Sequence, residues 1–259
     1  MEVDGLLLDI DGVLSVSWEP IDGAVETLGW LREQRIPFRL ITNTTTHTRD
    51  ALARTLREAG FAVDVPEIVT AVVATARYLR AHHSGSRVFL LSDGDARADL
   101  EGVTLVGPDE PADVVVIGGA SDVFTYSTLN HVFRSLMDGA SLVGMHRNMF
   151  WRTAEGLELD GGAYIAGLEE ATGARATICG KPAPAYFHAA LDVLGVSAAS
   201  AVMVGDDVMN DVLAAQGIGM TGVLVRTGKF RPADLERDDV APDHVIDSFA
   251  DLPTLLRTT

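Results

Sequence analysis

Cysteine is nearly absent from this sequence, since Cys179 is the only one among 259 residues. A single cysteine cannot form a disulfide within the chain, so we expect Cys179 to be a small buried hydrophobic residue and see no sign of an oxidising compartment. Long apolar runs are also absent. Stretches such as DVVVIGGA, residues 113–120, are far shorter than the roughly 20 residues that cross a bilayer. The sequence therefore predicts no disulfide and no transmembrane helix.

Positive charge is scarce: 20 Lys and Arg residues stand against 37 Asp and Glu residues, which gives a formal net charge of −17. Such a balance repels nucleic acid and anionic lipid, so we expect neither nucleic acid nor a membrane as a partner. One basic run, RTGKFR at residues 226–231, is expected to be a solvated loop. The chain starts with Met-Glu-Val-Asp and no secretory pattern, so we expect a cytoplasmic protein.

What is present is a set of apolar runs that end in polar side chains. The segment GLLLDIDG, residues 5–12, begins like a buried strand of a parallel sheet and then places Asp9 and Asp11 one residue apart. Charges belong where a strand leaves the core, so both aspartates are expected at a carboxyl end. In open α/β sheets ligands bind at that edge.

Helical and strand patterns alternate along the chain. Helical spacing is found at residues 24–31, 48–59, about 66–81, 185–194 and 211–216, and apolar strand patterns at 38–41, 201–205 and 222–225. This alternation predicts a doubly wound parallel sheet. Residues between these halves carry their own strands and helices, the latter at 127–137 and 163–172. We therefore predict one domain from residues 1–77 and 178–259, with a second domain, residues 78–177, inserted into it.

Four separate pieces place polar groups just after a strand or just before a helix. They are Asp9 with Asp11, Thr42 with Asn43, Lys181, and Asp206 with Asp207 and Asp211. Strand ends of a doubly wound sheet converge, and clustered carboxylates repel one another unless a cation or a proton lies between them. Oxygen ligands suit Mg²⁺, so Asp9, the backbone carbonyl of Asp11 and Asp206 are the predicted ligands. Asp207 and Asp211 are expected to orient them.

The four sequences DIDG, TNTT, GKP and GDDVMND, in this order, resemble the four motifs of the haloacid dehalogenase superfamily. Within it the chain is similar to the NagD-like branch, subfamily IIA, in which a cap domain is inserted between the second and third motifs. The resemblance implies an α/β fold: a doubly wound, Rossmann-like core with an inserted α/β cap. Relatives in this branch often have a serine where this chain has Asp11.

The resemblance also implies a function, that of a magnesium-dependent phosphatase acting on a small phosphorylated metabolite. By this resemblance Asp9 is the nucleophile that forms the aspartyl-phosphate, and Asp11 is the general acid and base. The phosphoryl group is bound by Thr42, Asn43 and Lys181. The magnesium site is formed by Asp9, Asp11 and Asp206, and it is supported by Asp207 and Asp211. A carboxylate attacks a phosphoryl group only when the negative charge is neutralised, which suits a cation and a lysine. Relatives are often dimers through the cap, which favours a homodimer here.

Two cap segments, GMHRNMFW at residues 144–151 and LELDGGAY at 157–164, look like the segments that face the active site in this branch. On that resemblance His146, Arg147 and Asp160 are candidate substrate contacts. The remaining histidines are scattered without the spacing of a zinc site.

Two alternatives remain at this point. One is a phosphotransferase or mutase, which passes the same phosphoryl group to a hydroxyl instead of water. The other is a phosphorylatable receiver-like binding module, which also combines an acidic pocket with a Thr and a Lys. Asp11 beside Asp9 argues against the receiver, because an adjacent acid activates water and shortens the life of the phosphoenzyme.

Overall fold

The computed structural model describes residues 3–152, 156–236 and 240–257. The chain divides into two compact units. Unit 1 comprises residues 1–42, 49–69 and 181–259, and unit 2 comprises residues 43–48 and 70–180. Within the described ranges, none of the helices combines the length and the apolar character that crossing a membrane requires.

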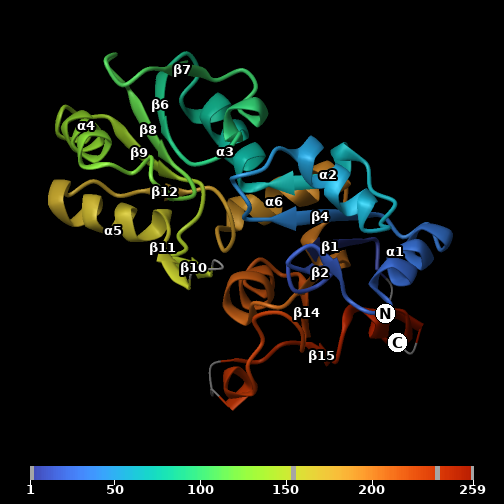
Figure 1. The fold of residues 1–259 in the computed structure, drawn as a ribbon. Coiled ribbons are helices and arrows are strands. Elements are labelled where there is room, and N and C mark those ends of the chain that lie inside the picture. Colours follow the sequence, from blue (N-terminus) through green and yellow to red (C-terminus); the bar gives the residue numbers. More distant parts are fainter. Residues whose placement is uncertain (1–2, 153–155, 237–239, 258–259) are drawn as a thin grey trace. The chain divides into compact units, whose positions relative to one another are not determined.

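Unit 1 is built on a six-stranded sheet in the order β15-β14-β13-β1-β4-β5 (Figure 1). Its strands are β1 (Gly5–Asp9), β4 (Phe38–Thr42), β5 (Ile68–Thr70), β13 (Ala201–Gly205), β14 (Thr221–Val225) and β15 (His244–Ile246). Pairing is parallel from β15 through to β4. All five residues of β1 and of β13 are buried, as expected for central parallel strands covered on both faces.

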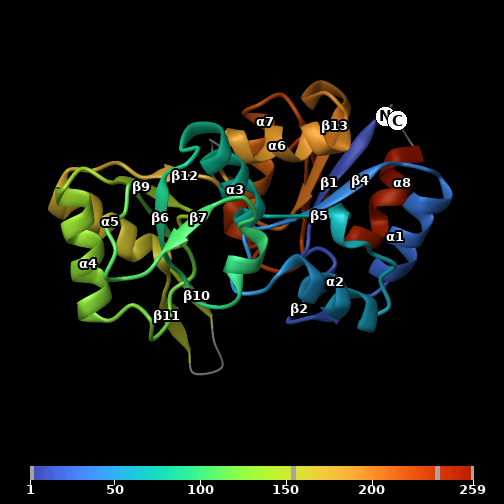
Figure 2. The same ribbon diagram turned by 90° about the horizontal axis from the view of Figure 1, so that it is seen from above.

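Helices cover the two faces of this sheet (Figure 2). Leu6 and Leu8 of β1 point into a cluster with α1 (Ala24–Glu33), α2 (Arg49–Glu58) and α8 (Leu252–Arg257). Successive strand residues face opposite sides. The other side is covered by α6 (Pro184–Leu194), by the π-helical turn η4 (Val208–Leu213) and by α7 (Ala214–Gln216). A short antiparallel pair, β2 (Ser15–Val16) and β3 (Glu19–Pro20), follows β1.

The strand order of unit 1 reverses between β1 and β13. From β1 the chain proceeds to β4 and β5 on one side, and it later adds β13, β14 and β15 on the other. Asp9 ends β1 and Asp206 directly follows β13, so both carboxylates lie at the carboxyl ends of the two strands that flank this reversal. Such a switch point leaves a crevice where ligands bind.

Unit 2 has a second parallel sheet in the order β12-β9-β8-β6-β7. The strands are β6 (Arg87–Leu91), β7 (Thr104–Val106), β8 (Val114–Ile117), β9 (Ser141–Gly144) and β12 (Thr177–Ile178). Helix α3 (Ala71–His82) packs on one face, and α4 (Tyr126–Met137) and α5 (Gly161–Thr172) pack on the other. An antiparallel pair, β10 (Phe150–Arg152) and β11 (Leu157–Leu159), precedes α5. Short 3₁₀ turns are η1 (Val65–Glu67), η2 (Ala96–Asp99), η3 (Ala198–Ser200), η5 (Pro232–Glu236) and η6 (Phe249–Asp251).

The expected elements are confirmed with two corrections. Five of the expected helices lie within two residues of the bounds observed for α1, α2, α4, α5 and α6, and Cys179 is buried as expected. The helix expected from about residue 66 begins instead at Ala71, because Ile68, Val69 and Thr70 form the edge strand β5. β-Branched residues favour a strand, and the Thr70 hydroxyl then caps α3 by accepting the N–H of Val73 at 3.2 Å. The short helix expected at 211–216 starts earlier, as η4.

Candidate functional site

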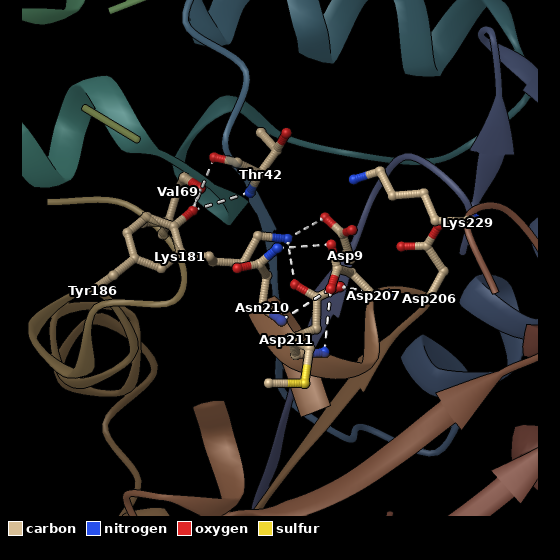
Figure 3. Close-up of polar contacts among 11 residues, drawn as sticks. Asp9, Thr42, Val69, Lys181, Tyr186, Asp206, Asp207, Asn210, Asp211 and Lys229 are labelled. Atoms are coloured by element: carbon tan, nitrogen blue, oxygen red, sulfur yellow. Dashed lines mark hydrogen bonds and ion pairs between the residues drawn. The ribbon is translucent and has the colours of Figure 1, made fainter. Parts of the chain in front are cut away.

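A buried lysine joins two carboxylates at the carboxyl edge of the unit 1 sheet (Figure 3). The Lys181 Nζ lies 2.7 Å from Oδ1 of Asp9 and 2.7 Å from Oδ1 of Asp211. All three side chains are buried. Burial by itself lowers the pKa of Lys181, but the charges of Asp211 and Asp9 outweigh it, so the pKa is raised and the ammonium stays charged.

The turn after β13 places Asp211 beside Lys181. Asp207 is the N-cap of η4, and its Oδ1 accepts the N–H groups of Met209 and Asn210 at 3.2 and 3.0 Å. Capping of this kind satisfies the first donors of a helical turn. Oδ2 of Asp211 in turn accepts the Asp207 N–H at 3.3 Å. Both oxygens of Asp211 therefore have partners within the protein, and Asp207 shapes the turn that presents Asp211.

Asp206 is held by backbone instead of by Lys181. Its Oδ2 accepts the N–H of Lys229 at 2.7 Å. Gly12 and Gly228 both have positive φ, and a Cβ at either position would overlap this same oxygen. The other oxygen, Oδ1, is buried and has no hydrogen-bond partner among the residues that the structure describes. A buried carboxylate oxygen without a partner is costly, which points to a ligand at this position.

Three buried carboxylates meet here. Asp9, Asp206 and Asp211 each offer an oxygen, and these oxygens lie within 4.8 Å of one another. Burial, followed by the charge of Asp9, raises the pKa of Asp206 to about 7. Burial also raises the pKa of Asp211 to about 8, against the opposing charge of Lys181. The pKa values stay raised despite the nearby lysines, so the cluster holds either protons or a cation. An all-oxygen donor set with an unpartnered oxygen fits Mg²⁺.

Asp11 differs from these buried acids because its side chain is exposed. Desolvation against its neighbours and the charge of Asp9 nevertheless raise its pKa, although the backbone N–H of Ser17 and the charges of Lys229 and Lys181 oppose the shift. A carboxyl group with a raised pKa that remains accessible is suited to exchanging a proton with a ligand.

Thr42 and Asn43 lie at the carboxyl end of β4, but they belong to different units. Thr42 ends β4 in unit 1 and is buried, whereas Asn43 is the first residue of the segment assigned to unit 2. The backbone N–H of Thr42 donates to Oη of Tyr186 at 3.0 Å. The same Oη donates to the carbonyl of Val69 at 2.6 Å. Tyr186 thus positions the end of β4 from α6.

The three candidate residues of the inserted segment have structural partners in unit 2. The His146 Nε2 lies 3.8 Å from Oδ2 of Asp160, and both side chains are buried. Oδ1 of Asp160 caps α5 by accepting the Gly161 N–H at 2.7 Å. Arg147 forms an ion pair with Glu169. Substrate contact by His146, Arg147 and Asp160 stays a prediction.

Two residues of the site escaped the sequence interpretation. Tyr186 lies in the helix predicted at residues 185–194, and nothing local indicates that its hydroxyl reaches β4. Lys229 lies in the run RTGKFR, which was expected to be a solvated loop, yet its backbone and that of Gly228 pack against Asp206. The position of this run directly after the apolar strand β14 was the available signal, because strand ends converge at this edge.

Comparison with known families gives two matches. The sequence model described as haloacid dehalogenase-like hydrolase matches residues 6–105, and one described as HAD-hydrolase-like matches residues 178–252. The human phospholysine phosphohistidine inorganic pyrophosphate phosphatase is 35% identical over 260 residues, which cover 98% of this chain and 94% of that protein.

Two solved structures are similar to this chain over nearly its whole length. A p-nitrophenyl phosphatase from Archaeoglobus fulgidus superposes with a TM-score of 0.90 at 29% identity, covering 98% of this chain and 100% of the other. NagD from E. coli K-12 superposes with a TM-score of 0.88 at 26% identity, covering 97% of this chain and 98% of the other.

Proposed function

Because this chain belongs to the haloacid dehalogenase-like hydrolases, we propose that it is a magnesium-dependent phosphatase that hydrolyses a small phosphorylated metabolite. The observation that carries the proposal is the buried group formed by Asp9, Lys181, Asp206 and Asp211 at the switch point of the unit 1 sheet. It combines a carboxylate nucleophile with an adjacent cation and a cation-binding set of oxygens.

In the first half of the reaction a carboxylate oxygen of Asp9 attacks phosphorus. The bond from phosphorus to the ester oxygen breaks, and Asp11 gives its proton to the departing alcohol. In the second half Asp11 takes a proton from water, and the resulting hydroxide attacks the phosphorus of the aspartyl-phosphate. Inorganic phosphate leaves, Asp9 is a carboxylate again, and Asp11 is protonated again. The raised pKa of Asp11 suits both transfers.

Charge neutralisation is divided among the residues around Asp9. Lys181 lies 2.7 Å from the nucleophile and offsets negative charge on the phosphoryl oxygens as the bond forms. Asp9, the backbone carbonyl of Asp11 and Asp206 would hold Mg²⁺, which when bound supplies further positive charge to the phosphoryl group. Asp211 keeps Lys181 in place, and Asp207 supports Asp211 through the η4 turn.

Substrate selection is proposed to lie outside this chemistry. In the proposed division, residues 1–77 and 178–259 form the catalytic core and residues 78–177 form the cap. Thr42 and Asn43 bind the phosphoryl group, while His146, Arg147 and Asp160 contribute to recognition of the remainder of the substrate. Proteins that share a fold often differ in the residues that recognise the substrate.

We also propose a homodimer through the cap. Exposed apolar side chains on and beside β10 and β11 support this, namely Met149, Phe150, Leu157 and Leu159. Such a patch is a typical protein contact surface. Light scattering of the wild type and of Phe150→Glu tests it: a dimeric wild type and a monomeric variant are expected, and a monomeric wild type would contradict the proposal.

The reaction is tested by phosphate release from a panel of sugar phosphates, nucleoside monophosphates, pyridoxal phosphate, p-nitrophenyl phosphate, pyrophosphate and phosphoamidates. We expect turnover that stops with a chelator and returns with Mg²⁺. Asp9→Asn should be inactive but folded, whereas Asp22→Asn, a matched change at an exposed aspartate of unit 1, should retain turnover. Hydroxylamine trapping should mark Asp9 in the wild type alone.

Two results would count against this proposal. Near-normal turnover by a folded Asp9→Asn variant would remove the aspartyl-phosphate. Substrate consumption that exceeds phosphate release when a sugar acceptor is present would instead identify a phosphotransferase.

A further inference from the structure

The loop at residues 226–231 is built onto the carboxylate cluster of unit 1. The Thr227 hydroxyl donates to the carbonyl of Gly12, and the Lys229 N–H donates to Asp206. Gly228 has φ of 61°, and a Cβ there would collide with both Asp206 and the backbone of Gly12. The loop is therefore fixed by backbone contacts, and these contacts determine where the side chain of Lys229 begins.

The side chain of Lys229 is directed into an acidic neighbourhood. Figure 3 shows it extending toward Asp9, on the opposite side of Asp9 from Lys181. Its charge interacts attractively with Asp9 and Asp206 and opposes the rise in the pKa of Asp11. The two lysines are thus the cations that act on the nucleophile from its two sides.

These two lysines differ in what they already bind. Lys181 is buried and forms ion pairs with Asp9 and Asp211. Lys229 is exposed, and its ammonium makes neither an ion pair nor a hydrogen bond with any of the residues that the structure describes. An ammonium near a nucleophile that forms no ion pair with a carboxylate remains available to an anionic ligand.

The negative charge around Asp9 explains why phosphate binding needs the ammonium of Lys229. Four carboxylates, those of Asp9, Asp11, Asp206 and Asp211, interact with one another in this part of unit 1. In the proposed reaction Asp11 is protonated when the substrate arrives, so Lys181 and a bound divalent cation would offset the three remaining negative charges. The charge of Lys229 would then be left for the phosphate. A phosphate dianion approaching a chain of net charge −17 needs such local compensation.

We propose that Lys229 is a substrate-binding residue whose ammonium contacts an anionic oxygen of the phosphoryl group, on the side of Asp9 opposite Lys181. This inference rests on the proposed phosphatase function and adds to it a second phosphate contact. The contact exists as soon as the dianion is bound, because the charge on phosphate is present before any bond is formed. Lys229 therefore contributes mainly to binding.

The test compares Lys229→Met with Arg231→Met, which removes the same charge from an exposed side chain of the same loop. Dissociation constants for inorganic phosphate, measured by calorimetry in Mg²⁺, are the first measurement. We expect Lys229→Met to weaken phosphate binding by about ten- to a hundredfold, as the loss of one charge-assisted hydrogen bond predicts. KM should rise by a similar factor and kcat should fall less. Lys229→Arg should recover part of the affinity, and Arg231→Met should match the wild type.

A second measurement separates substrate binding from metal positioning. Lys229→Met keeps the backbone N–H that donates to Asp206, so the affinity for Mg²⁺ alone should be unchanged or higher after one positive charge is removed. Weaker Mg²⁺ binding with unchanged phosphate affinity would overturn the proposal and make Lys229 a support of the metal site. Phosphate binding of wild-type strength in Lys229→Met would also overturn it while leaving the phosphatase proposal intact. A wild-type protein that binds no phosphate in Mg²⁺ would refute both.

Discussion

Replacing Lys181 by methionine is expected to destabilise unit 1 in a pH-dependent way. The substitution keeps most of the side-chain volume and removes the charge that lies 2.7 Å from both Asp9 and Asp211. Breaking a buried ion pair by removing one partner costs about 3–5 kcal/mol, because the remaining charge is buried without compensation. We expect a loss of this size at about pH 8 in the presence of a chelator.

The pH dependence follows from the pKa values of the acids that remain. In the folded wild type the pKa of Asp211 is about 8, above the value near 4 of an aspartate in an unfolded chain. The folded protein then holds a proton that the unfolded chain releases, so this contribution to stability is complete below about pH 4 and is lost as the pH rises through about 8. Loss of Lys181 raises this pKa further. A protonated carboxyl group carries no charge for Lys181 to offset. The free energy of unfolding of the variant should therefore fall by about 1–2 kcal/mol less at about pH 6 than at about pH 8.

Urea unfolding followed by tryptophan fluorescence measures this loss. In a Trp151→Phe background the remaining tryptophans, Trp18 and Trp30, both belong to unit 1. Arg231→Met removes an equal charge from an exposed side chain and should change the free energy of unfolding by less than about 0.5 kcal/mol. A cost for Lys181→Met below about 1 kcal/mol at about pH 8, or an equal cost at both pH values, would refute this reasoning.

Three further changes test other parts of the site. Asp11→Asn should lower turnover of an alkyl phosphate by about 10²- to 10⁴-fold, and a change in KM alone would make Asp11 a binding residue. Tyr186→Phe should cost about 1–3 kcal/mol in urea unfolding, because the N–H of Thr42 and the carbonyl of Val69 both lose the hydrogen bond to this hydroxyl; an unchanged midpoint would contradict this. Gly228→Ala should weaken Mg²⁺ binding measured by calorimetry, because its Cβ would displace Asp206, and unaltered binding would show that the loop gives way instead.

Much of the fold follows from local patterns. The apolar run before Asp9 is the fully buried strand β1, and alternating strand and helix signals correctly predict parallel sheets. Burial on both faces makes such strands continuously apolar, which is visible in a short window. The exception near residue 66 has a local cause as well: three β-branched residues at 68–70 form an edge strand where helical spacing was expected.

Only part of the site can be predicted from such local sequence patterns. The acids and Lys181 stand out because charged residues at strand ends are conspicuous against apolar neighbours. Partners of buried polar groups are not conspicuous: Tyr186 reaches Thr42 across 144 residues of sequence, and nothing near Tyr186 indicates this contact. Lys229 is inconspicuous for the same reason, because an exposed lysine beside a glycine has the local pattern of an ordinary loop.

The sequence by itself determined the kinds of groups at this site: carboxylates and a lysine at the ends of apolar strands. Tertiary structure decided which of them meet. Asp9 and Asp206 are about 200 residues apart in sequence. They lie at one edge of the sheet because β13 pairs with β1 in a register that sets Val204 against Leu8. Strand order and register are cooperative properties of the whole sheet, since each depends on which faces are buried together. They also decided that Lys181 is shared between two acids while Lys229 remains open to a ligand.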